Sequence, residues 1–182
     1  MASTRERALH AAVDEVADHG IRALTHTRVD RRAGLPPGST SNWFRTRSAL
    51  LAGLVEHIAA SERTTAPTRA AEQITSPDAL VDTLTATIEA LTGEHARRTR
   101  VRLTLFLDAA HDDELLAPLH EQRAAFVTWT TALLAQVGAR HPAEAARTLL
   151  ACGNGLVFHR LTVDPEAPVR PVVERAVRAC LD

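Results

Sequence analysis

The sequence predicts an all-α protein of about nine helices. Apolar residues recur at spacings of three and four in nearly every segment, and no alternating pattern bounded by hairpin signals appears. The 182 residues are 45% apolar and 24% charged, which is ordinary for a soluble protein with a real core. We therefore expect helical packing throughout the chain.

Four helices are expected in the first third of the chain. Gly20 stands where the first helix should end, and Thr25 suits the N-cap of the second. The glycines and prolines of residues 34–38 separate the second helix from the third. These helices are expected up to residue 19, from 25 to 33, from 38 to 44 and from 47 to 60.

The rest of the chain predicts five longer helices. Residues 64–77 are rich in proline and threonine and read as a linker. Gly138 ends one periodic segment, and Pro142 suits the first turn of the next. The five helices are expected at 78–92, 95–109, 113–137, 142–162 and 169–181.

Several classes of protein are excluded by composition. The N-terminus lacks the apolar stretch of a signal peptide, and no segment approaches the ~20 apolar residues of a membrane span. Cys152 and Cys180 lie far apart and lack metal-ligand spacing. We expect a reduced cytoplasmic protein without a cofactor, a metal or a membrane partner.

Charge is distributed unevenly along the chain. Residues 1–47 hold eight arginines and five acids, whereas the remainder holds thirteen arginines and seventeen acids. A basic N-terminal segment followed by an acidic remainder is typical of a small nucleic-acid-binding module joined to a non-binding domain.

The stretch LPPGSTSNWF, residues 35–44, carries the strongest functional signal. A tight Gly- and Pro-rich turn leads into a short helix that begins with four small polar residues, as in a helix-turn-helix pair. Such side chains suit contacts to phosphates and base edges in a major groove. We expect Phe44 to face inward as an anchor and Trp43 to be partly exposed. An ordinary capped turn with two core aromatics is the alternative.

Together with its flanks, this stretch resembles the DNA-binding domain of the tetracycline-repressor (TetR) family over about 55 residues. Asp30, Thr40, Ser41, Trp43 and Ser48 depart from the family pattern. The matching residues are Thr25, Val29, Ala33, Gly34, Leu35, Gly38, Phe44, Arg47, Ala49, Leu50 and Leu51.

The resemblance implies a helix-turn-helix domain at residues 1–47 and an effector-binding and dimerisation domain at 48–182. It implies a homodimeric transcriptional regulator, a repressor rather than an enzyme, that binds a palindromic operator on double-stranded DNA. A small hydrophobic or aromatic effector would release that operator. The implied DNA contacts are Thr25, Thr27, Arg28, Pro37, Gly38, Ser39, Thr40, Asn42, Trp43 and Arg47.

The resemblance implies that the last two helices form the dimer face, and reading two half-sites requires a two-fold partner. Intramolecular core is the alternative for the same residues. The expected interface residues are Leu149, Gly153, Leu156, Val157, Val173 and Val177.

The family resemblance also implies an effector pocket among the middle helices. The alternative is that its apolar residues are ordinary core, in which case the body binds a protein partner or only dimerises. The candidate ligand-binding residues are Leu84, Ile88, Arg102, Phe106, His111, Phe126, Trp129, Thr130 and Leu133.

The segment HDDELLAPLH, residues 111–120, is the one candidate for metal chemistry. Its acids also suit a helix N-terminus, where the macrodipole favours negative charge, and no zinc-type spacing occurs. We prefer the helix cap, and an all-α metal-dependent enzyme remains the remote alternative.

Overall fold

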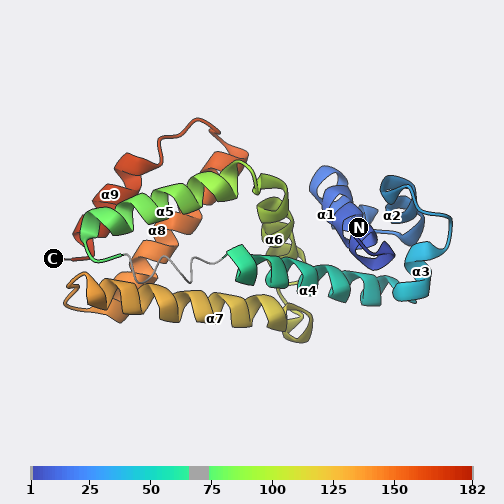
Figure 1. Ribbon diagram of the computed structural model, residues 1–182, viewed down its shortest axis with the longest axis horizontal. Coiled ribbons are helices and arrows are strands. Elements are labelled where there is room, and N and C mark those ends of the chain that lie inside the picture. Colours follow the sequence, from blue (N-terminus) through green and yellow to red (C-terminus); the bar gives the residue numbers. More distant parts are fainter. Residues whose placement is uncertain (1, 66–73, 182) are drawn as a thin grey trace. The chain divides into compact units, whose positions relative to one another are not determined.

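The computed structural model describes residues 2–65 and 74–181, and within them the chain is helical with no strand. The all-α prediction is confirmed, whereas residues 66–73 of the expected linker lie outside the described residues. Figure 1 shows the helices in chain order. They are α1 (Thr4–His19), η1 (Ile21–Ala23), α2 (His26–Ala33), α3 (Ser39–Trp43), α4 (Arg47–Thr65), α5 (Pro77–Thr92), α6 (Ala96–Asp108), α7 (Asp113–Gln136), α8 (Pro142–Thr162) and α9 (Arg170–Ala179).

The chain divides into two compact units. The first unit comprises residues 1–65 and 97–122, and the second comprises residues 66–96 and 123–182. The first unit therefore includes α4, α6 and the start of α7 in addition to the three N-terminal helices. This division into compact units does not test the functional boundary expected after residue 47, which stays a prediction.

The short helices of the first unit begin and end at polar contacts. Ser3 and Glu6 form a reciprocal capping box at α1, and Thr25 accepts a hydrogen bond from the backbone N–H of Arg28 at α2. Gly34 ends α2 in the left-handed conformation, with φ 61°. Arg7 donates to the carbonyls of Ala33 and Gly34, so the free end of α2 is satisfied by α1.

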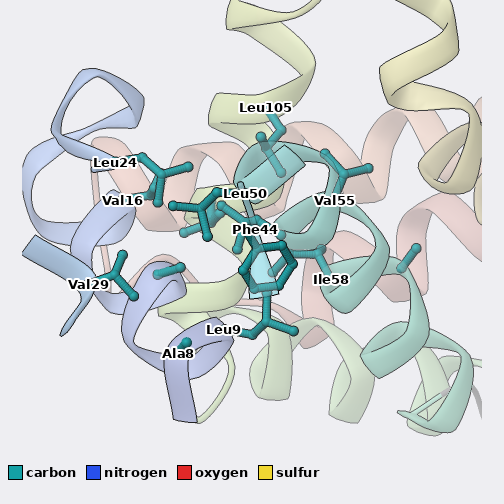
Figure 2. Close-up of a cluster of buried hydrophobic side chains, with 14 of the residues drawn as sticks. Ala8, Leu9, Val16, Leu24, Val29, Phe44, Leu50, Val55, Ile58 and Leu105 are labelled. Atoms are coloured by element: carbon teal, nitrogen blue, oxygen red, sulfur yellow. The ribbon is translucent and has the colours of Figure 1, made fainter. Parts of the chain in front are cut away.

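Phe44 anchors the core of the first unit. Phe44 is 6% exposed, and its ring lies among Leu9, Leu50 and Ile58, as Figure 2 shows. A Cβ atom at Gly53 of α4 would stand 2.4 Å from this ring, so glycine makes room for it. The expected inward position of Phe44 is confirmed, and α4 runs to Thr65, five residues beyond its predicted end.

The second unit packs α5, α8 and α9 around apolar side chains. Leu80 and Leu84 of α5, Leu149 of α8 and Val177 of α9 are all buried. Arg160 of α8 donates to the hydroxyl of Thr92 at 3.0 Å and to the carbonyl of Ala167. None of the described helices combines the length and the apolar character that crossing a membrane requires.

Candidate nucleic-acid interface

The helix α3 exposes part of the predicted DNA-contacting set. Trp43 is 55% exposed, as expected, and Asn42, Gly38 and Pro37 are exposed as well. Gly38 has a φ of 89°, which only glycine adopts readily, so the turn itself requires this residue. Ser39 is half-buried, and its hydroxyl donates to the carbonyl of Pro36 at 2.7 Å.

Thr40 was predicted to contact DNA from the exposed start of α3, and its position in the structure contradicts this prediction. Its side chain is fully buried, and its hydroxyl donates to the carboxylate of Asp30 on α2. Oδ1 of Asp30 also accepts the backbone N–H of Thr40, and Oδ2 accepts that of Gly38, both at 2.8 Å. We call these three residues the Asp30 cluster. Asp30 therefore occupies two backbone N–H groups at the start of α3, which are not free to bind a phosphate.

The other end of α3 is also tied to α2. Nε2 of His26 lies 2.6 Å from the carbonyl oxygen of Phe44, so this ring nitrogen donates the hydrogen bond. Sequence reasoning did not find either contact. The available signal was that Asp30 and Thr40 both depart from the family pattern, ten residues apart.

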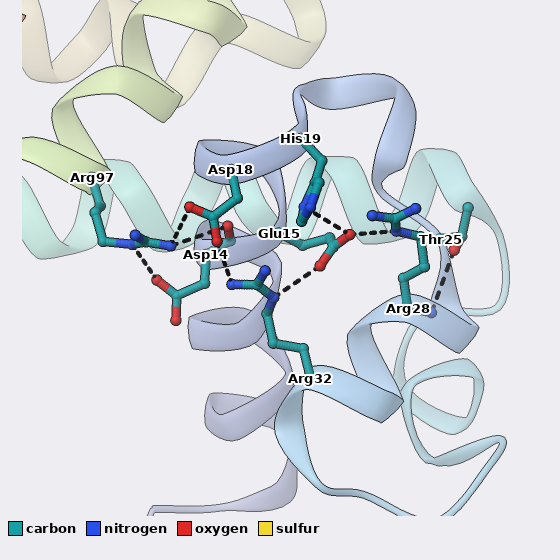
Figure 3. A network of polar contacts seen from close by, with 8 residues as sticks. All are labelled: Asp14, Glu15, Asp18, His19, Thr25, Arg28, Arg32 and Arg97. Atoms are coloured by element: carbon teal, nitrogen blue, oxygen red, sulfur yellow. Dashed lines mark hydrogen bonds and ion pairs between the residues drawn. The ribbon is translucent and has the colours of Figure 1, made fainter.

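A network of charges joins α2 to α1 and α6 (Figure 3). Glu15 is 3% exposed and accepts hydrogen bonds from Arg28 and from Arg32, the latter at 2.8 Å. Burial acts to raise the pKa of Glu15, but the hydrogen bonds from both arginines outweigh it, and the pKa lies below its ordinary value. The buried carboxylate is therefore charged at neutral pH.

Asp18 extends the network to α6. It accepts from Arg97 and from Arg32, each at 2.7 Å, and these two guanidinium groups lower the pKa of its carboxyl. Arg97 also donates to Asp14 at 2.8 Å. Alternating charge thus runs from α6 through α1 to α2.

Both arginines predicted to contact DNA also make hydrogen bonds within the protein. Arg28 bonds Glu15, and Arg47 donates to the carbonyls of Ile21 at 2.8 Å and Leu24 at 3.2 Å. Thr25 caps α2, whereas Thr27 is exposed. Sequence reasoning missed three exposed arginines whose side chains bond no other described residue: Arg22, Arg31 and Arg45. Arg45 was identifiable from its place directly after Phe44.

The predicted dimer face lies inside the protomer. Leu149, Leu156, Val157, Val173 and Val177 are at most 8% exposed. They pack in the second unit, where α8 contacts α5 and α9, whereas Gly153 is half-buried. These five side chains therefore belong to the core of the protomer, and a role of Gly153 at an interface stays a prediction. The same helices expose Phe158 at 50% and Val172 at 37%.

The predicted pocket residues are divided between the two units. Arg102 pairs with Glu62 at 3.1 Å, Phe106 stacks on His120, and His111 is exposed, all in the first unit. Three of the nine predicted residues thus belong to the first unit and six to the second.

In the second unit, Leu84, Ile88 and Phe126 border an apolar cavity of about 60 Å³. Trp129 stacks on Phe126 at 5.4 Å between ring centroids, and its buried indole N–H has no acceptor among the described residues. Thr130 and Leu133 are buried, and the Thr130 hydroxyl donates to the carbonyl of Phe126 at 2.8 Å.

Residues 111–120 contain the start of α7, as expected from the helix cap that was preferred to a metal site. Oδ1 of Asp112 accepts the backbone N–H of Leu115 at 2.9 Å and caps α7. Among residues 2–65 and 74–181, no group of three or more His, Cys, Asp or Glu side chains is arranged to hold a metal ion.

Comparisons with known proteins agree with this architecture. Residues 75–182, more than half of the chain, match the family described as "Tetracyclin repressor-like, C-terminal domain". No curated protein matches the sequence.

Solved structures match over nearly the whole chain. A transcriptional regulator from Rhodococcus sp. Rha1 has a TM-score of 0.80 and 20% identity, covering 98% of this chain and 96% of that one. A TetR-family regulator from Mesorhizobium loti has a TM-score of 0.78 and 13% identity, covering 98% and 95%. The multidrug binding protein EbrR, complexed with ethidium, has a TM-score of 0.64 and 26% identity, covering 96% and 98%. The chain belongs to the TetR family of transcriptional regulators.

Proposed function

We propose that this regulator is a homodimeric repressor that reads a palindromic DNA operator with α3 and is released from it by a small molecule. The observation that carries the DNA part is the exposure of Asn42 and Trp43 on a short helix held at both ends by α2. Family membership supports the same conclusion.

The exposed side chains have two proposed roles: one contacts a base edge, and the others contact the DNA backbone. The amide of Asn42 pairs with a base edge in the major groove, where a bidentate amide contact suits adenine. Arg31 and Arg45 flank α3 in sequence and contact phosphates, which position the protein without reading sequence. The ring of Trp43 lies against the sugar-phosphate backbone.

Salt dependence of duplex binding tests this division. Arg31→Ala and Arg45→Ala should each weaken binding to all duplexes and lower the slope of log K against log salt by about one. Arg123→Ala, an exposed arginine of α7 in the second unit, is the matched control and should leave the slope unchanged. If the slope of all three variants equals that of the wild type, the DNA face lies elsewhere.

The proposed dimer face is the outer surface of α8 and α9, in place of the buried residues first expected. Phe158 and Val172 are the large apolar side chains exposed there, and Ala151 and Gly155 lie on exposed turns of α8. A charge at Phe158 would be desolvated at such an interface, so Phe158→Arg should yield a folded monomer in sedimentation. The control Arg123→Ala, exposed on α7 and outside α8 and α9, should remain dimeric, and a wild type that is monomeric at micromolar concentration contradicts the dimer.

The proposed effector site is the apolar cavity of the second unit. At about 60 Å³ it is smaller than the ~300 Å³ of an ordinary ligand pocket, so an effector must bind a state in which this cavity is larger. EbrR, a fold relative, was solved with ethidium, which makes this aromatic cation a suitable probe.

Ethidium intercalates into duplexes, so the titration is made on the protein alone. Fluorescence enhancement should saturate with wild type and weaken with Phe126→Ala, whereas Ala86→Leu on the exposed side of α5 should bind normally. If ethidium and a panel of apolar aromatic compounds neither bind nor raise the melting temperature, the second unit binds a protein partner or only dimerises.

A further inference from the structure

We propose that Asp30 is the positioning residue of the reading helix: its buried carboxylate, together with His26, fixes the direction in which α3 presents Asn42 and Trp43. This inference rests on the proposed DNA-binding function and names the residues by which α2 controls α3. Asp30 is 4% exposed and lies in the interior of α2, so it cannot itself contact DNA.

The helix α3 needs such support because it is only five residues long. An isolated helix of this length is unstable, and its backbone makes few hydrogen bonds of its own. Its N-terminus is bonded to Asp30 through the N–H groups of Gly38 and Thr40 and through the Thr40 hydroxyl. Its C-terminus is bonded to His26 through the Phe44 carbonyl. Because both ends of α3 are bonded to α2, the direction of α3 relative to α2 is fixed.

The ionised carboxylate suits this task better than any neutral side chain. Both of its oxygens accept, so it satisfies three donors at once, and charge-assisted hydrogen bonds are stronger than neutral ones. An asparagine in its place would turn an NH₂ group toward either Gly38 N–H or Thr40 N–H. Two donors would then face each other in a buried site, and α3 would shift away from α2.

Positioning and simple electrostatics predict opposite results for Asp30→Asn. Removing a negative charge from a DNA-binding unit should strengthen duplex binding, because phosphates repel carboxylates. Loss of the fixed direction should instead weaken it, because the exposed side chains no longer meet their base edges and phosphates together. The sign of the change separates the two accounts.

The experiment compares Asp30→Asn, Thr40→Val and Thr40→Ser with the wild type on operator DNA selected from random duplexes. Asp30→Asn and Thr40→Val should each weaken binding by about ten-fold or more, whereas Thr40→Ser keeps the hydroxyl and should stay within about three-fold. Asp108→Asn, an exposed acid of the same unit, removes one charge without touching α3 and should bind as tightly as the wild type or more tightly.

Trp43 provides a second reading that does not require DNA. In a Trp129→Phe background it is the one remaining tryptophan, and Asp30→Asn should shift its emission and lower its anisotropy while helical circular dichroism stays constant. If Asp30→Asn unfolds the unit, the comparison of Thr40→Val with Thr40→Ser decides in its place.

The inference is overturned if Asp30→Asn and Thr40→Val both keep the operator affinity and the Trp43 emission of the wild type. If the wild type binds no duplex even at low salt, the proposed function fails. The emission of Trp43 then still decides whether Asp30 positions α3.

Discussion

Among the described residues, buried carboxylates distinguish the first unit from the second, although both units have an apolar core. In the first unit, buried carboxylates bond backbone N–H groups and arginines, so that α1, α2 and α3 are joined by directional contacts. In the second unit, α5, α8 and α9 pack through aliphatic side chains beside an apolar cavity. Directional contacts define one arrangement, whereas apolar packing beside a void tolerates changes of volume.

This difference matches the two tasks that the proposed function requires. A reading surface must be presented in one geometry, because a small displacement separates side chains from base edges. A sensing body must have a second state that a ligand can stabilise. Four substitutions probe the comparison, and we take them from the largest expected effect to the smallest.

The largest effect is expected at Gly53. A methyl group there would stand 2.4 Å from the buried Phe44 ring, so the ring would have to shift against its packed neighbours. Gly53→Ala should therefore lower the free energy of unfolding of the first unit by about 1–3 kcal/mol, as overpacked cores do. Thermal denaturation followed by circular dichroism measures this. Ala52→Gly, at the exposed neighbouring position, should cost only about 1 kcal/mol through helix propensity.

Next in size is the loss of the Glu15 charge. Glu15→Gln removes the carboxylate that Arg28 and Arg32 share and should lower the free energy of unfolding at pH 7 by about 1–2 kcal/mol. The pKa of Glu15 is lower in the folded protein, so its stabilisation is present above the unfolded-chain value of about 4.3 and is lost as pH falls through the folded value.

The difference between wild type and Glu15→Gln should therefore shrink as the pH is lowered below about 4. Chemical denaturation at several pH values measures it. A difference that is constant down to pH 2 contradicts the assigned role of the charge.

A smaller effect of opposite sign is expected at Gly153, the counterpart of Gly53 in the second unit. A Cβ there would lie 3.9 Å from Ile88, an ordinary contact. Gly153→Ala should therefore raise the free energy of unfolding by about 0.5–1 kcal/mol through helix propensity. Destabilisation by the same substitution would show that this region is packed as tightly as the Phe44 core.

The smallest effect is expected at the exposed pair of Arg170 and Asp82, which are 55% and 63% exposed. Arg170→Ala should leave the free energy of unfolding nearly unchanged, because water and salt screen such pairs. A loss as large as that of Glu15→Gln would mean that surface charges, and not buried ones, distinguish the two units.

The sequence predicted most of the fold because long amphipathic helices carry their own signal. The inward position of Phe44, the exposure of Trp43 and the cap at Asp112 followed from spacing and local chemistry. The Asp30 cluster did not, because a hydrogen bond between residues ten apart depends on how two helices pack. The face of α8 was misassigned for a similar reason: Leu156 belongs to an apolar stripe, and periodicity does not say whether a stripe meets its own chain or a partner.

Asn42 offers the most direct test of the central claim, that exposed side chains of α3 read DNA sequence. The affinities of wild type and Asn42→Ala are measured on the duplex selected by the wild type and on a scrambled duplex of equal length and composition, at the same salt concentration. A lost base contact should weaken binding to the selected duplex by about ten-fold and leave binding to the scrambled duplex unchanged. Equal affinities of the two proteins for the selected duplex, or an equal loss on both duplexes, would contradict the account.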